Sequence, residues 1–140
     1  MVPRLIKGQC YSDNRGNVFY NNDFDASLIK RIYVIENKEV NFIRGWQGHR
    51  IEQRWFSVIT GIFKIQLIQV DNWEKPSKEL LVKSFIIDAT KLNILYVPNG
   101  YLTSIQSLEV NSKLLVMADY LLGETNDEFR FEIDYFKIKT

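Results

Sequence analysis

The stretch Gln53–Val70, QRWFSVITGIFKIQLIQV, contains two strand-like segments on either side of Gly61. In the second segment, Ile62–Val70, apolar residues alternate with the polar residues Lys64 and Gln66 over most of the length. A period of two residues is typical of a β-strand with one face buried in the protein and the other in water. Glycine between the segments supplies the positive φ that tight turns require. The stretch therefore predicts two consecutive strands joined by a turn.

The first of these segments, Gln53–Thr60, carries bulky apolar groups on both of its faces. Trp55 and Ile59 lie on one face, and Phe56 and Val58 lie on the other. A strand of this kind is either covered on both sides by its own chain or presents an apolar face that another subunit covers. Both alternatives remain open from the sequence.

The rest of the chain repeats the same pattern of short strands and polar turns. Segments rich in Val, Ile, Phe and Tyr are separated by turn signals such as Pro98-Asn99-Gly100, and no segment of helical length keeps a 3.6-residue apolar stripe. This pattern in 140 residues, without an internal repeat, predicts one all-β domain over 1–140, a sandwich or barrel. The predicted strands are Leu28–Glu36, Phe42–Gln47, Gln53–Thr60, Ile62–Val70, Leu80–Ile87, Leu92–Val97 and Leu114–Leu121, with weaker ones at Gly16–Tyr20, Leu102–Gln106 and Phe129–Phe136.

The composition is that of an ordinary globular protein with many large rings. Hydrophobic residues make up 46% of the chain, charged residues 25% and aromatic residues 14%. The net charge of +1 supplies no long-range field for nucleic acid or an anionic membrane, so neither is predicted as a partner. A single cysteine cannot form an internal disulfide, and one cysteine with one histidine cannot form a closed zinc site.

No segment predicts export or a membrane span. The first residues lack the apolar stretch of a signal peptide, and no later run approaches the roughly 18 apolar residues that cross a membrane. We therefore predict a cytoplasmic protein.

Three segments in the first half of the chain carry a resemblance to known proteins. They are Ile29–Ile35, IKRIYVI, then Arg44–Arg50, RGWQGHR, and the following Glu52–Arg54, EQR. Together they resemble the dTDP-4-keto-6-deoxyglucose 3,4-ketoisomerases and, more distantly, the dTDP-4-dehydrorhamnose 3,5-epimerases. The segment Lys113–Tyr120 is similar to the last core strand of the ketoisomerases. The resemblance implies an RmlC-like cupin, which is a double-stranded β-helix or jelly roll.

The wider cupin pattern binds a metal through two histidines one residue apart, a glutamate and a third histidine on a later strand. In this chain those positions fall on Gln47, His49, Arg54 and Thr103. Only the histidine is a good ligand for a transition metal, because a guanidinium repels the metal and an amide is a weak donor. We therefore predict no metal and no other cofactor.

His49 is the candidate catalytic base. In both sugar families the reaction is proton transfer beside a ketone, which needs a base with a pKa near neutrality. The epimerase base, in an Arg-Gly-x-His motif, falls here on Gln47, and an amide takes up no proton at neutral pH. The ketoisomerases have histidine there and again two residues later, and the second is retained as His49. The resemblance thus implies His49 as base, with Gln47 beside it on the same strand face; the alternative is a hydrogen-bonded core histidine.

Gln47 and four more residues are candidates for substrate binding. Arg44 falls where the sugar families keep an arginine; its alternative is a surface ion pair. Arg54 falls on an active-site lysine of the epimerases, where a cation stabilises an enolate; its alternative is a salt bridge at the barrel rim with Glu52. Arg31 and Tyr33 share a strand face, and Tyr33 either stacks on the nucleotide base, donates a proton or packs in the core.

Two functions of different classes follow from the resemblance. The first is a metal-free ketoisomerase or epimerase of a dTDP-4-keto-6-deoxyhexose in the biosynthesis of surface-polysaccharide sugars. The second is a cupin that binds a nucleotide sugar, or serves as a non-enzymatic subunit, after losing the chemistry. The general acid is unassigned, because the acid tyrosine of the epimerases falls on Leu115, with Tyr120 and Tyr101 nearby. We predict a homodimer in both cases, since both families are dimeric and an open sheet edge invites pairing.

Overall fold

The computed structural model describes residues 1–138, and this range consists of strands, turns and loops without a helix. It therefore contains no helix that is long and apolar enough to cross a membrane. The all-β prediction is confirmed, and each strongly predicted strand is present with ends that differ by a few residues. The strands are β1(Arg4–Ile6), β2(Gln9–Asp13), β3(Gly16–Tyr20), β4(Arg31–Ile35), β5(Ile43–His49), β6(Arg54–Thr60), β7(Ile62–Gln69), β8(Val82–Asp88), β9(Ile94–Val97), β10(Tyr101–Ser107), β11(Lys113–Ala118) and β12(Glu128–Arg130).

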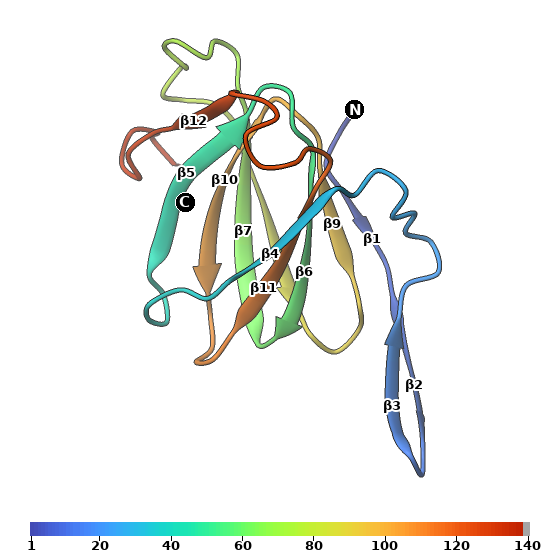
Figure 1. Ribbon diagram of the computed structural model, residues 1–140. Helices are drawn as coiled ribbons and strands as arrows, with labels where there is room; N and C mark the ends of the chain where they lie inside the picture. The colour runs from blue at the N-terminus through green and yellow to red at the C-terminus, as the bar shows by residue number, and fades with distance from the viewer. Residues whose placement is uncertain (139–140) are drawn as a thin grey trace.

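Two five-stranded antiparallel sheets form the body of the molecule (Figure 1). One has the strand order β1-β9-β6-β11-β4, and the other has the order β12-β5-β10-β7-β8. Neighbouring strands come from distant parts of the chain, as where β6 lies between β9 and β11. This connectivity is that of a jelly roll. β4 and β12 are edge strands, and no backbone ladder joins the two sheets there within residues 1–138.

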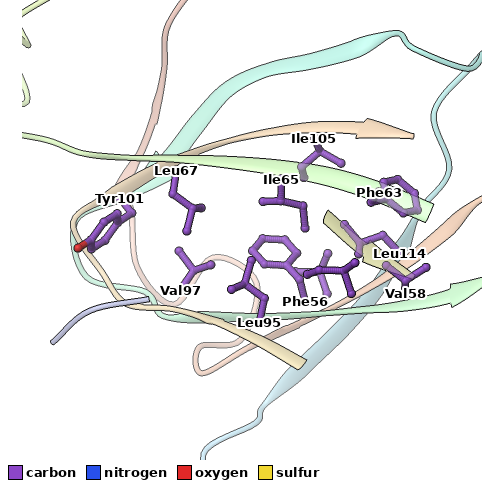
Figure 2. Close-up of a cluster of buried hydrophobic side chains, with 12 residues drawn as sticks. Phe56, Val58, Phe63, Ile65, Leu67, Leu95, Val97, Tyr101, Ile105 and Leu114 are labelled. Carbon is purple, nitrogen blue, oxygen red and sulfur yellow. The ribbon is translucent and has the colours of Figure 1, made fainter. Parts of the chain in front are cut away.

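A single apolar core fills the space between the two sheets (Figure 2). β6 contributes Phe56 and Val58, and β7 contributes Phe63, Ile65 and Leu67, all of them almost fully buried. The alternation of apolar and polar residues along β7 predicts these last three side chains in the interior. Burying a side chain of this size stabilises the fold by about 1.5–3 kcal/mol. The core therefore fixes which face of each strand points inward.

Two smaller apolar clusters cover the outer faces of the sheets. Trp55 of β6 packs on the outside against Tyr96 of β9, with the ring centroids 5.3 Å apart. Trp46 of β5 packs against Phe136 of the C-terminal tail, with centroids 5.6 Å apart. Of the two alternatives for the outer face of β6, cover by its own chain therefore holds around Trp55. Ile59, at the end of the same strand, is half exposed.

Three segments differ from the sequence predictions. The sequence predicts neither β1, which is too short to show a period, nor β2, which is polar and exposed. β2 pairs only with β3, and this hairpin projects from the body of the molecule (Figure 1). The strand predicted over Phe129–Phe136 ends at Arg130. The remaining residues form an irregular tail, because their aromatic rings pack against Trp46 rather than extending the sheet.

Candidate active site

The inner face of the barrel positions the candidate catalytic residue. Backbone pairing places Gln47 opposite Thr103 and His49 opposite Tyr101. Directly paired residues share a face of a sheet, and Tyr101 belongs to the core between the sheets, so Gln47 and His49 face the barrel interior. The six candidates come from three strands: Arg31 and Tyr33 from β4, Arg44, Gln47 and His49 from β5, and Arg54 from β6.

A bulge in β5 brings Arg44 to the same side as Gln47. Strict alternation would place Arg44, three residues earlier, on the opposite face. The register between β5 and β10 shifts between the pairs Gln47–Thr103 and Arg44–Ile105. Because Ile105 belongs to the inner core, Arg44 takes the inner side as well. Its Nε donates a hydrogen bond to Oδ1 of Asn37 at 3.3 Å.

Two cavities lie beside β5, and Gln47 lines both. The larger one, about 630 Å³, runs past Arg44 to the tail segment 130–135. Four of the six candidates meet in the smaller one, whereas Arg54 lies outside the lining of both. The smaller cavity measures about 260 Å³ and is lined by Arg31, Tyr33, Gln47, His49, Glu52 and residues of the loop 121–128.

A carboxylate from a distant loop holds His49. Nδ1 of His49 lies 3.3 Å from Oδ1 of Asp127, whose Oδ2 accepts the backbone N–H groups of Ile51 and Glu52, each at 2.8 Å. Burial alone would raise the pKa of Asp127, but these hydrogen bonds hold the pKa below its usual value. Asp127 is therefore ionised at neutral pH and can only accept. The ring proton of His49 consequently lies on Nδ1, and Nε2 carries the lone pair that a base needs.

The environment keeps His49 neutral. Burial lowers the pKa of His49, and the positive charge of Arg54 lowers it further, against the opposing influence of Asp127. A neutral imidazole can take up a proton at pH 7. The side chain is buried and hydrogen-bonded, as a core histidine would be, but it also lines a cavity.

Glu52 faces the other nitrogen of the ring. Its Oε2 lies 3.2 Å from Nε2 of His49, and the residue is only 6% exposed. Among the described residues, Oε2 has no partner with hydrogen-bond geometry. Burial raises the pKa of Glu52, and the nearby charge of Arg54 offsets part of this effect. His49 thus lies between two carboxyl groups, one at each ring nitrogen.

Arg54 places a buried positive charge beside the cavity. It is 3% exposed, and its Nη2 lies 3.4 Å from both the carbonyl oxygen of Gln47 and Oγ1 of Thr103. Burial lowers the pKa of Arg54, although a guanidinium remains protonated in proteins. No ion pair with Glu52 or another carboxylate forms within residues 1–138, so the rim salt bridge is not the arrangement found. Because Arg54 is absent from the lining of both cavities, it acts on them through its charge rather than through direct contact.

β12 adds polar groups next to Gln47. Nε2 of Gln47 donates a hydrogen bond to Oε1 of Glu128 at 2.9 Å, and the same oxygen accepts from Nε of Arg130. Backbone pairing sets Glu128 opposite His49 and Arg130 opposite Gln47. Gln47 is therefore a fixed hydrogen-bonding group at the junction of the two cavities.

These residues do not fit the metal of the wider cupin pattern. The two carboxyl groups address opposite nitrogens of one ring and so cannot share an ion with it. Gln47, Arg54 and Thr103 stand at the other ligand positions of that pattern. Within residues 1–138, no group of three or more His, Cys, Asp or Glu side chains could hold a metal ion.

Sequence reasoning did not identify Asp127 or Glu128. Asp127 is separated from His49 by 78 positions in the chain, and its contact depends on how the loop after β11 folds back. The sequence around these two residues shows only a polar loop before a weak strand, and an ordinary surface turn has the same pattern. Neither Tyr101 nor Tyr120, the tyrosines considered as the acid, lines the smaller cavity.

Comparison with known proteins finds the fold but no sequence family. No family model and no curated protein matches the sequence. A variant of the 3,4-ketoisomerase QdtA from Thermoanaerobacterium thermosaccharolyticum, in complex with TDP-4-keto-6-deoxyglucose, is 22% identical, with a TM-score of 0.71 over 95% of this chain and 90% of that chain. A 3,4-ketoisomerase from Helicobacter canadensis is 22% identical, with a TM-score of 0.72 over 96% of this chain and 95% of that chain.

A third similar structure belongs to the other sugar family. The dTDP-4-dehydrorhamnose 3,5-epimerase from Bacillus anthracis, with TDP and PPi bound, is 15% identical, with a TM-score of 0.69 over 87% of this chain and 75% of that chain. At these identities the likeness shows the fold. The predicted cupin jelly-roll fold is confirmed, and the similar structures come from the two families named by the sequence resemblance.

Proposed function

We propose that this protein is an isomerase of a dTDP-4-keto-6-deoxyhexose in the synthesis of surface-polysaccharide sugars, with His49 as the base. The observation that carries the proposal is the state of His49. It is a neutral imidazole in the lining of a cavity, with its Nδ1 proton directed to Asp127. Nε2 is then the nitrogen that takes up a carbon-bound proton beside the ketone.

Positive charge around the cavity supports an enolate intermediate. Arg54 is buried without an ion-pair partner among the described residues, and Arg31 lines the cavity from β4. Arg31 lies over the ring of Tyr33, with Cζ 4.5 Å from the ring centroid. Fixed cations in a site with little water stabilise the negative charge that develops on the ketone oxygen.

The two adjoining cavities fit the two parts of a nucleotide sugar. The smaller one, about 260 Å³, holds the proton-transferring residues and takes the sugar. The larger one, about 630 Å³, offers Arg44 and Arg130 to the pyrophosphate, and Phe131 and Tyr135 to the base. Cavities for small molecules are usually about 300–1,000 Å³, so the smaller one alone would not take the whole ligand.

The test is hydrogen exchange at the carbon beside the ketone. The wild-type protein, mixed with dTDP-4-keto-6-deoxyglucose in D₂O, should incorporate deuterium there, as followed by NMR. His49→Asn should abolish the incorporation and leave dTDP binding, measured by calorimetry, within about threefold. Restoring histidine with Gln47→His should raise the exchange rate. The enzyme proposal would be refuted if the wild type binds dTDP-sugars but incorporates no deuterium over hours.

A binding module is the second candidate, and Gln47 favours it. Its amide is held by Glu128 and takes up no proton, so the position of the epimerase base carries no base. Such a cupin would keep the affinity of the pocket for dTDP-sugars and lack exchange. The experiment above separates the two functions.

We further propose a second copy of this chain as the protein's partner. Ile32 and Val34 lie on the edge strand β4 with side chains 65% and 55% exposed. Val18 and Phe19 are exposed on the projecting β2–β3 hairpin. An unpaired edge and apolar side chains left in water are both covered when two copies associate. Light scattering at micromolar concentration should give twice the chain mass of 16.5 kDa, and Ile32→Glu should give the single mass.

A further inference from the structure

The proposed isomerisation needs a proton donor as well as a base, and the cavity offers a carboxyl group for this task. Tyr101 is buried in the inner core, and Tyr120 lies outside the lining of the smaller cavity. Glu52 lines that cavity directly beside His49. It is more than nine-tenths buried, and its Oε2 has no hydrogen-bond partner among the described residues.

The short contact between Glu52 and His49 favours one proton on the pair. With Asp127 fixing the ring proton on Nδ1, Nε2 carries the lone pair and lies 3.2 Å from Oε2, outside hydrogen-bond geometry. Two lone pairs at this distance in a buried site repel each other, whereas one shared proton makes the contact favourable. Burial raises the pKa of Glu52 and lowers the pKa of His49, and both directions favour the proton on the carboxyl group.

We propose that Glu52 is the general acid of this site and shares one mobile proton with His49. The inference rests on the isomerase function proposed above. When a hydroxyketone binds, the carboxyl O–H turns from Nε2 to the ketone oxygen. His49 then has a free lone pair for the carbon-bound proton, and the acid and base act on neighbouring atoms of one substrate.

The proton balance closes over one turnover. Nε2 of His49 takes the proton from the hydroxyl-bearing carbon, the electron pair of that C–H bond forms the C=C bond, and Glu52 protonates the ketone oxygen. The product of this step is an enediol, facing an imidazolium and a carboxylate. In the second step the imidazolium protonates the former ketone carbon. Glu52 then takes the hydroxyl proton from the neighbouring oxygen, which becomes the new ketone, so both residues regain their starting forms.

Glu52→Gln tests the role because glutamine keeps the shape and donates an N–H to Nε2 but has no proton to transfer. Conversion and deuterium incorporation with dTDP-4-keto-6-deoxyglucose should fall by about 10²–10⁴-fold, while dTDP affinity stays within about threefold. The matched control is Glu79→Gln on the exposed β7–β8 connection, whose conversion and exchange rates should equal those of the wild type. A purely positioning role predicts that Glu52→Gln retains most of the rate.

The pH dependence separates the acid from its neighbours. The wild type should lose kcat/KM on the alkaline side as the shared proton is lost, and Glu52→Asp should move this limb to a different pH. Two results would overturn the acid role and leave the isomerase function standing. One is a Glu52→Gln rate within threefold of the wild-type rate, and the other is an alkaline limb that Glu52→Asp leaves unchanged and Tyr33→Phe abolishes. If Glu52→Gln does not fold, the pH of the alkaline limb in Glu52→Asp tests the acid role instead. Absence of any exchange in the wild type would instead refute the isomerase function, and the acid role with it.

Discussion

Replacing Asp127 with asparagine should reverse the tautomer of His49. Oδ2 of Asp127 accepts the backbone N–H groups of Ile51 and Glu52, so the amide oxygen of the asparagine has to remain on that side. Its NH₂ group then faces Nδ1 of His49, which lies 3.3 Å from Oδ1 in the wild type. Nδ1 must become the acceptor, and the ring proton moves to Nε2. The nitrogen proposed as the base loses its lone pair.

The expected loss of stability is moderate. A hydrogen bond to a charged group contributes about 1.5–3 kcal/mol, against about 0.5–1.5 kcal/mol for a neutral one. Neutralising Asp127 therefore weakens each of its contacts by about 1 kcal/mol. Removing a buried charge offsets part of this loss, because burial is the largest single influence on Asp127. We expect the free energy of unfolding to fall by about 1–2 kcal/mol and the exchange rate to fall by about 10²–10⁴-fold.

The assay benefits from the presence of a single histidine in the chain. Its two ring nitrogens give one pair of ¹⁵N signals by NMR, and their shifts should interchange between wild type and Asp127→Asn. Urea unfolding measures the stability, with the exposed Asp134→Asn as a control that should stay within about 0.5 kcal/mol. A wild-type ring protonated on Nε2, or a variant with the tautomer unchanged, would refute the reasoning.

Three further predictions concern Glu52, Gly48 and the metal. Because burial holds the pKa of Glu52 above 4.5, the stabilising contribution of Glu52 is present below pH 4.5 and is lost as pH rises through the folded pKa. The melting temperature of Glu52→Gln should therefore rise relative to that of the wild type as pH increases above 4.5, and a difference that stays constant with pH would contradict this. At Gly48 a Cβ would clash with the carbonyl oxygen of Tyr101, so Gly48→Ala should lower the free energy of unfolding by about 3 kcal/mol or more. Gly45→Ala, with its nearest contact at 3.6 Å, should change the free energy of unfolding by less than about 1 kcal/mol, and equal urea midpoints for the two variants would contradict the packing argument. Protein purified without chelator should contain no stoichiometric transition metal by elemental analysis, and one equivalent of iron, manganese or zinc lost in His49→Asn would overturn the ligand argument.

The strand pattern could be read locally because a half-buried strand repeats every two residues. The alternation of Phe63, Ile65 and Leu67 therefore predicts the inner face of β7, and all three side chains are almost fully buried. The same rule predicted that Gln47 and His49 share a face. The rule fails for Arg44, because the bulge in β5 inserts one extra residue and a two-residue period does not predict a bulge.

The polar contacts of the site could not be read in the same way. Asp127 contacts His49 across 78 positions in the chain, and nothing in the sequence around either residue identifies the other. Glu52 is close to His49 in sequence, but the sequence suggests only Arg54 as its partner. The turn after β5 instead directs its carboxyl group to Nε2 of His49.

From the sequence alone came the all-β class, the cupin likeness and the candidate base at His49, because these depend on local periodicity and on a motif contiguous in the chain. Only the tertiary structure decided which atoms surround His49. A carboxyl group becomes an acid, an acceptor or a counter-ion according to its burial and its neighbours, and those are set by chain segments that meet only when the two sheets close.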